Sequence, residues 1–128
     1  MTIKLLYFKD LYKVGWFDFY TARIKNLVIN NSTPPTFDTS ISTSFDGEPS
    51  DGSEWRSKMF GPYITTIYVP DSAVATYQAD SNYNAYTIRG INEVDPNTNQ
   101  PYLTRYATND LWEAAGKPED ALIEEYMN

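Results

Sequence analysis

The side chains with which this sequence could do acid–base chemistry are mainly carboxylates, because it contains no histidine and no cysteine. A glycosidase needs two carboxyl groups about 5 to 9 Å apart in a cleft. The chain has 17 Asp and Glu residues, with 11 tyrosines and three tryptophans to wall a cleft, but no spacing selects a pair. We therefore predict no catalytic residue and no enzyme activity, and a carboxylate-pair hydrolase is the remaining enzymatic alternative.

Metal chemistry has one candidate segment. The lack of cysteine excludes a disulfide framework and a thiolate metal site, and the lack of histidine removes the commonest transition-metal ligand. In DPNTNQ, Asp95, Asn97 and Asn99 match the beginning of a calcium loop. Gln100 replaces the glycine that the loop needs, and Tyr106 replaces its final acid. We predict a polar turn there, no metal site and no cofactor.

Net charge narrows the choice of partners. The chain carries a formal charge of -7, and residues 1–64 are balanced, with seven basic and seven acidic side chains. The second half therefore holds all of the acidic excess, which we interpret as a solvated surface. Only the stretch from Met1 to Lys25 leans basic, with five basic against two acidic side chains. We predict no nucleic-acid partner, because phosphate binding needs a basic stripe.

No apolar run approaches the roughly 20 residues that cross a bilayer, so we predict no membrane partner. The apolar run Leu5 to Phe8 is too short for the core of a signal peptide. We therefore expect a chain that is not exported.

The elements that must position any site suggest one domain of the α+β class. Alternation in Thr2 to Tyr7 predicts a first strand, and Trp16 to Tyr20 a second. Ile24 to Ile29 is a further strand, which must end at Asn30 to Pro35 because proline cannot donate to a ladder. A polar segment rich in Gly, Ser and Pro, residues 38–63, predicts a long surface loop.

The following segment predicts a strand, a cap and a helix. Thr65 to Val69 is rich in β-branched residues, Pro70 stops the strand, and Asp71 or Ser72 caps a helix that ends near Ala79. Val74 and Tyr77 on one helix face pin it to the strand. Another strand, Tyr86 to Ile91, completes the unit.

The C-terminal segment, residues 108–128, predicts two short helices. Thr108 or Asn109 caps the first, and Gly116 is a left-handed stop. Pro118 suits the first turn of the last helix. The apolar stripe of that helix consists of Leu122, Ile123, Tyr126 and Met127.

The N-terminal segment is unusually aromatic. Its large rings are closely spaced, and they are Tyr7, Phe8, Tyr12, Trp16, Phe17, Phe19 and Tyr20. Core packing is the plain interpretation, and an anchor against another macromolecule is the alternative, because aromatic residues are enriched at interface centres.

Two stretches, LVINNSTPPTF from Leu27 and TTIYVPDSAVATYQADSNYNAYTIRGI from Thr65, carry a family resemblance. Together they resemble the terminal unit of the BspA-like leucine-rich repeats of surface proteins of gut and oral anaerobes. The matching positions are Thr33, Pro34, Pro35, Ile67 to Pro70, Asp71, Val74, Tyr77 and Tyr83. The resemblance covers about half of the chain, Leu27 to Ile91. The full repeats that precede this unit in the family are absent, and an insertion, Phe45 to Tyr63, separates the two halves.

The resemblance implies an interaction protein, since repeats of this family carry no catalytic residues. A lone terminal unit cannot bury a continuous core. We expect residues 1–26, as an anchor, and the C-terminal helices to complete it. An exposed face is expected at Trp55, Phe60, Tyr77, Tyr83 and Tyr86.

The expected function is that of a bacteriophage virion component: a head fibre, a decoration protein or a tail-associated protein. Phages of such hosts carry host-like adhesive modules on chains made without a secretory signal. The expected partners are other virion proteins or sister chains, in a homo- or hetero-oligomer. The alternative is an adhesion domain of a bacterial surface protein that binds glycan or protein.

Overall fold

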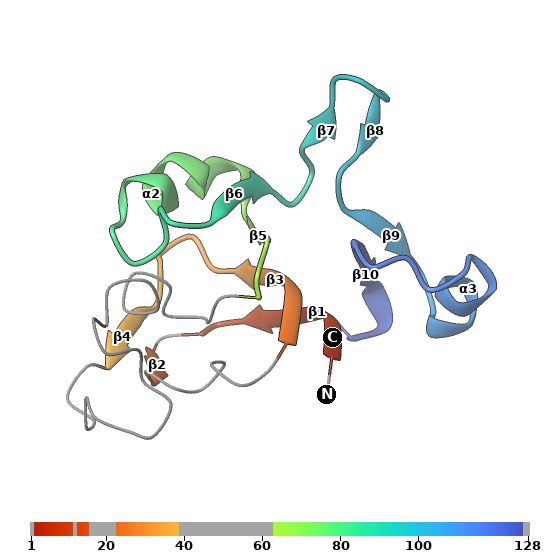
Figure 1. Cartoon of the computed structure of the whole chain (residues 1–128), viewed down its shortest axis with the longest axis horizontal. Helices are drawn as coiled ribbons and strands as arrows, with labels where there is room; N and C mark the ends of the chain where they lie inside the picture. Colours follow the sequence, from red (N-terminus) through yellow and green to blue (C-terminus); the bar gives the residue numbers. More distant parts are fainter. Residues whose placement is uncertain (1, 12, 16–22, 39–62, 127–128) are drawn as a thin grey trace.

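A main sheet of four parallel strands forms the centre of the protein (Figure 1). The computed structural model describes residues 2–11, 13–15, 23–38 and 63–126. The strand order is β1-β3-β5-β6. The bounds of these strands are Thr2–Lys9 (β1), Arg23–Asn30 (β3), Thr66–Val69 (β5) and Thr87–Gly90 (β6).

The main sheet grows in chain order with a recurring spacing. Thr2 of β1 pairs with Arg23 of β3, and Thr66 of β5 pairs with Thr87 of β6, so the difference in residue number is the same in both pairs. Between β3 and β5 the spacing is longer, because Asn26 pairs with Thr66 across the polar segment. A second parallel ladder joins β2 (Lys13–Gly15) to β4 (Thr36–Asp38). Strands that follow one another as parallel neighbours make this part of the chain a stack of coils.

Both faces of β3 are buried, which explains its unbroken apolar run. Leu27, Val28 and Ile29 are each 0% exposed. Leu27 and Ile29 belong to a cluster on one face, the inner cluster, whereas Val28 belongs to a cluster on the opposite face, the outer cluster. A parallel strand covered on both sides is expected to show such a run rather than alternation.

The connection from β5 to β6 covers the inner cluster. Pro70 ends β5, and a turn of 3-10 helix, η1 (Asp71–Ala73), leads into α2 (Val74–Ala79). Ala73 and Tyr77 are buried in the inner cluster, and Val74 packs against it. The predicted strand, helix and strand therefore all form, with ends close to those predicted.

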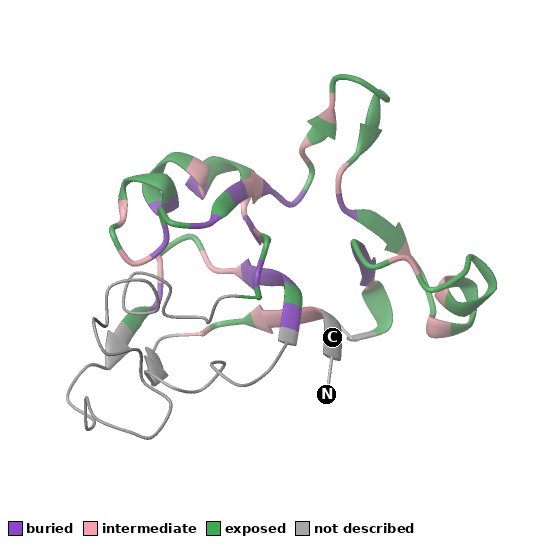
Figure 2. Cartoon of the chain, viewed as in Figure 1, coloured by how far each residue is buried: buried purple, intermediate pink, exposed green. Residues whose placement is uncertain are grey.

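The remaining residues, 91–126, form a C-terminal arm that returns across the outer cluster. A hairpin of β7 (Val94–Asp95) and β8 (Gln100–Pro101) projects from the sheet (Figure 1). The arm continues through β9 (Thr104–Tyr106), α3 (Asn109–Ala114), β10 (Ala121–Ile123) and η2 (Glu124–Tyr126). Figure 2 shows that most of the arm is exposed and that a few of its residues are buried. These are Ile91, Leu103, Ala121 and Leu122, and all but Ala121 join Val28 and Tyr68 in the outer cluster.

The arm confirms some predictions and corrects others. Thr108 caps α3 by accepting a hydrogen bond from Leu111 N, and Gly116 takes a left-handed φ of 92°. The predicted last helix is wrong, because Ala121–Ile123 is a strand paired in parallel with β9. Burial of Leu122 in the outer cluster favours this strand over a helix. The coarse prediction of mixed strands with few helices holds.

None of the described helices has the length and apolar character that a membrane span requires.

Candidate interaction surface

Two tyrosines predicted to be exposed lie instead at the centre of the inner cluster. Tyr77 and Tyr83 are each 0% exposed, and their rings meet edge to face with centroids 5.0 Å apart. The hydroxyl of Tyr77 donates to the carbonyl oxygen of Asn31 at 2.9 Å, and that of Tyr83 donates to Pro35 O at 2.5 Å. Burial raises the pKa of both tyrosines. These rings hold the turn after β3 against the next coil.

The predicted exposed face therefore requires correction. Tyr86 is 7% exposed and packs with the same inner cluster, so none of its three tyrosines faces solvent. Trp55 and Phe60, the other members of that face, lie outside the described residues, whereas Tyr63 at the end of the inserted loop is 46% exposed.

Asp71 has a different role from the predicted helix cap. No side chain caps η1 or α2. Instead Asp71 accepts two hydrogen bonds from Asn92, one from the backbone amide at 3.0 Å and one from Nδ2 at 3.1 Å. Arg105 of the arm donates to Asn92 Oδ1 at 2.8 Å. The carboxylate therefore links the end of β5 to the turn after β6, and the arm is attached to the same turn.

Glu93 blocks the backbone at the edge of β6. The Gly90 amide donates to Glu93 Oε1 at 3.2 Å, and Arg89 Nη1 lies 2.7 Å from Glu93 Oε2. The Arg89 guanidinium also stacks on the Tyr102 ring, 3.7 Å from its centroid. Because Ile91 N donates to Val69 O of the neighbouring strand, the amide of Gly90 points to the opposite, outer edge. Glu93 therefore occupies a donor that another strand would need.

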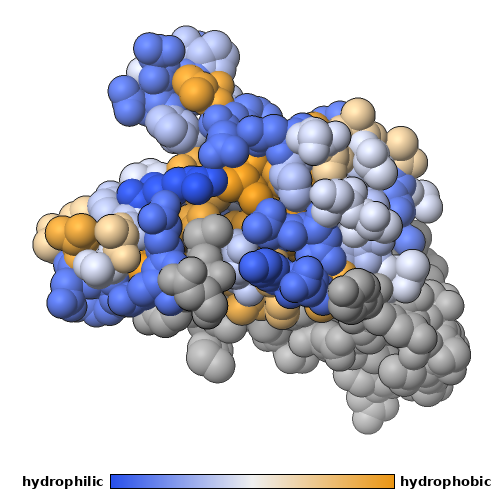
Figure 3. Space-filling view, turned by 180° about the vertical axis from the view of Figure 1, so that it is seen from behind, coloured by the Kyte–Doolittle hydropathy of each residue, from blue (hydrophilic) through white to orange (hydrophobic). Residues whose placement is uncertain are grey.

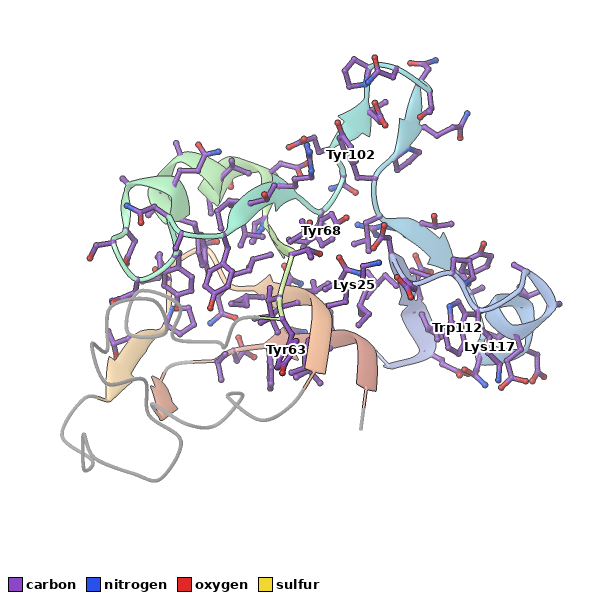
Figure 4. All side chains as sticks on the ribbon, viewed as in Figure 1. Lys25, Tyr63, Tyr68, Tyr102, Trp112 and Lys117 are labelled. Atoms are coloured by element: carbon purple, nitrogen blue, oxygen red, sulfur yellow. The ribbon has the colours of Figure 1, made fainter. Side chains whose placement is uncertain are left out.

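The arm is held on the outer face by apolar packing and by Glu119. Lys25 forms an ion pair with the carboxylate of Glu119, and this hydrogen bond raises the pKa of Lys25. The buried Asn26 donates to the Glu119 carbonyl oxygen at 3.2 Å. Burial against the arm raises the pKa of Tyr68 to about 12. Figure 4 shows Lys25 and Tyr68 on the side of the sheet that faces the arm. Trp112 and Lys117 lie at the end of the arm that is farther from the sheet.

The arm does not cover all of the apolar atoms on this face of the protein. Figure 3 shows an apolar area at the centre of this face, framed by hydrophilic atoms of the hairpin and the arm. The large apolar side chains most exposed among the described residues are Leu111 of α3, at 54%, Tyr63, at 46%, and Val94 of the hairpin, at 45%.

The opposite edge of the sheet has a different character. In β1, Leu5, Leu6, Tyr7 and Phe8 are all of intermediate burial, as Figure 2 shows. Leu6 and Phe8 pack against the inner cluster, whereas Leu5 and Tyr7 pack against the outer one. Tyr7 and Phe8 of the predicted anchor are therefore partly engaged within the chain. The other anchor residues, Tyr12, Trp16, Phe17, Phe19 and Tyr20, lie outside the described residues, as does the strand predicted there.

The candidate calcium segment forms the turn of the hairpin. Asp95 Oδ1 accepts from Asn97 N at 2.8 Å, and Asn99 has a φ of 58°. Across the described ranges, no three Asp or Glu side chains group closely enough to hold a metal ion. The carboxylate of Asp95 thus shapes the turn that the sequence predicts.

The residues that sequence reasoning missed are Asn31, Asn92, Glu93 and Glu119. Each forms a hydrogen bond with a partner that is distant in the sequence or lies across a turn. Polar residues are common in the turns and loops where these four residues occur. Asn31 is an example, because its side chain pairs with both backbone groups of Leu11, 20 residues away. No local signal distinguishes such a residue from a solvated one.

No family model matches this chain, and neither curated proteins nor solved structures give a significant match.

Proposed function

We propose that this chain is a non-enzymatic structural and interaction protein that works as a component of a bacteriophage virion. Its place there would be a head fibre, a decoration protein or a tail-associated protein. The observation that carries the proposal is the stack of parallel strands in chain order, in which the spacing between paired residues of β1 and β3 recurs between β5 and β6. Stacks of this kind present extended surfaces to other macromolecules.

The use of polar side chains supports a structural role. Asp71, Tyr77 and Tyr83 each bond to a neighbouring coil or turn rather than to one another. These residues lie in the region that resembles the terminal unit of leucine-rich repeats. We propose that the region from Leu27 to Ile91 is such a terminal unit and that β1 adds a coil to it.

The N-terminal segment supports attachment to a larger assembly. Its rings are numerous, and those of Tyr7 and Phe8 remain half-exposed at the edge of the sheet. Aromatic groups of this kind contribute strongly at interface centres. The proposed partners are sister chains or other virion proteins.

A second candidate function is adhesion at a bacterial cell surface, through glycan or protein binding. The half-exposed rings of Tyr102 and Trp112 on the arm favour it. Arg89 already stacks on the ring of Tyr102, so that ring presents one free face at most.

The deciding experiment is the location of the chain in purified phage particles. Truncation of the whole segment from Met1 to Tyr20 would also remove β1, so a substitution is the better test. We expect the triple variant Trp16→Ser, Phe17→Ser, Phe19→Ser to be lost from particles while it stays folded by circular dichroism. The matched control Leu111→Ser, Trp112→Ser changes the arm and should remain particle-bound. Absence of the wild-type chain from particles, with saturable glycan binding by the isolated chain, would favour the adhesin.

A further inference from the structure

The two edge strands of the main sheet, β1 and β6, differ in what lies along their outer sides. At the β6 edge Glu93 binds the amide of Gly90 and is held by Arg89. A charged side chain turned onto an edge is a device by which proteins prevent further strand pairing. The β1 edge has no such arrangement among the described residues.

The β1 edge instead presents apolar side chains on both faces. Leu5, Leu6, Tyr7 and Phe8 are all partly exposed, while their partners in β3 are at most 2% exposed. Among the described residues, β1 is the terminal strand and pairs with β3 alone in this sheet. A strand that fills the place beside β1 must itself be apolar on both faces, so that it continues both clusters.

We propose that this place is taken by β1 of a second copy of the chain, antiparallel about a two-fold axis. β1 is itself apolar on both faces, as the added strand must be. Its Leu6 and Phe8 pack against the inner cluster, and its Leu5 and Tyr7 pack against the outer one. The two sheets of four strands join into one. The inference rests on the proposed function and deepens it by naming the sister chain as the partner at this edge.

Alternation restricts the registers in which two copies of β1 can pair, and the proposed register is centred on Leu6. Directly opposite residues in an antiparallel pair lie on the same face. With Leu6 opposite Leu6 of the second copy, Leu5 lies opposite Tyr7 and Lys4 lies opposite Phe8. Lys9 then lies opposite Ile3, so no two lysines face each other. Such a two-fold contact closes as a dimer, whereas a head-to-tail contact between β1 and β6 would grow into a filament.

The absence of cysteine makes the register directly testable. We expect Leu5→Cys mixed with Tyr7→Cys to form disulfide dimers several-fold faster than either variant alone, because these positions face each other across the axis. Leu5→Cys mixed with Thr87→Cys, on the β6 edge, should give only background cross-linking. Wild-type chain should sediment as a dimer at micromolar concentration.

A charge on the edge provides the second test. Leu5→Lys should shift the chain toward monomer, whereas Thr87→Lys on the other edge should not, with circular dichroism as the check on folding. A wild-type chain that stays monomeric up to its solubility limit would overturn the proposal, and so would preferential cross-linking of Leu5→Cys to Thr87→Cys. Neither result bears on the presence of the chain in particles, so failure of the dimer and failure of the virion role are distinguishable.

Discussion

The hydroxyl of Tyr77 donates a 2.9 Å hydrogen bond to the carbonyl oxygen of Asn31, a residue 46 positions earlier in the chain. Tyr83 makes the same kind of contact with Pro35 O. The turn from Asn31 to Pro35 and the tyrosines of the helical unit are therefore parts of one contact between successive coils. The inner cluster depends on this contact, because both rings lie at its centre.

Removal of these hydroxyls should destabilise the fold without loss of the rings. We expect Tyr77→Phe and Tyr83→Phe each to lower the free energy of unfolding by about 1 to 3 kcal/mol, because a buried or partly buried carbonyl loses its donor. Urea denaturation measures the effect. Tyr102→Phe, at a half-exposed ring, is the matched control and should change stability by less than about 0.5 kcal/mol. Equal effects at all three positions would contradict the role of the buried contact.

The close approach of the Asp71 carboxylate leaves no room for a side chain at position 90, so glycine is required there. A Cβ atom built at Gly90 meets Asp71 Oδ1 far inside contact distance, so alanine there must displace the carboxylate from Asn92. We expect Gly90→Ala to cost about 1 to 3 kcal/mol of unfolding free energy. The double variant with Asp71→Ala should cost less than the sum of the two single changes, since the clash with the carboxylate then disappears. Strict additivity in denaturant titrations would disprove this coupling.

Leu122 anchors the arm to the outer cluster. It is 1% exposed and packs with Tyr68 and Leu103. We expect Leu122→Ala to cost about 2 to 5 kcal/mol. Hydrogen exchange should accelerate across residues 100–126 more than across β3 and β5. Leu111→Ala, at a side chain 54% exposed, is the control and should leave exchange unchanged.

Alkaline pH should weaken the fold through its buried tyrosines. The pKa of Tyr68 rises from 10.0 to about 12 on folding, so the neutral phenol is favoured in the folded state. Its contribution is complete below pH 10 and is lost as the pH rises toward 12, because the unfolded state releases its proton first. The raised pKa values of Tyr77 and Tyr83 act in the same direction. Unfolding measured between pH 8 and pH 11.5 should show a declining stability, and Tyr68→Phe should flatten that decline.

Opening the β6 edge should create a new association. In Glu93→Ala the Gly90 amide loses its acceptor and becomes free to pair with a strand. We expect species larger than dimers in sedimentation velocity, because both edges of the sheet are then available. Glu124→Ala is the charge-matched control. It also removes one carboxylate, but this carboxylate lies on the arm, 3.9 Å from Arg105 Nη1. An unchanged size distribution for Glu93→Ala would show that Glu93 does not guard this edge.

Local chemistry was sufficient to predict several elements. The apolar run of β3, the proline after Val69, the cap at Thr108 and the left-handed Gly116 each act through near neighbours in the chain. Asp95 is similar, since its turn depends on Asn97, close by in the sequence.

The errors share one physical cause. Tyr77, Tyr83 and Tyr86 carry a polar group on an apolar ring, so their sequence is compatible with either surface or core. The carbonyl groups that accept from Tyr77 and Tyr83 lie 46 and 48 positions earlier in the chain and are unknown from local sequence. The stripe around Leu122 likewise fits a helix or a strand until β9 provides a pairing partner.

The sequence by itself therefore determined the four strands of the main sheet, the turn at Asp95 and the absence of thiol and imidazole chemistry. Only the tertiary structure decided which face of each strand is covered, which tyrosines are buried and which sheet edge is closed. The reason is that burial and hydrogen-bond satisfaction depend on groups brought together from distant positions, as Glu119 is brought to Asn26 across 93 residues.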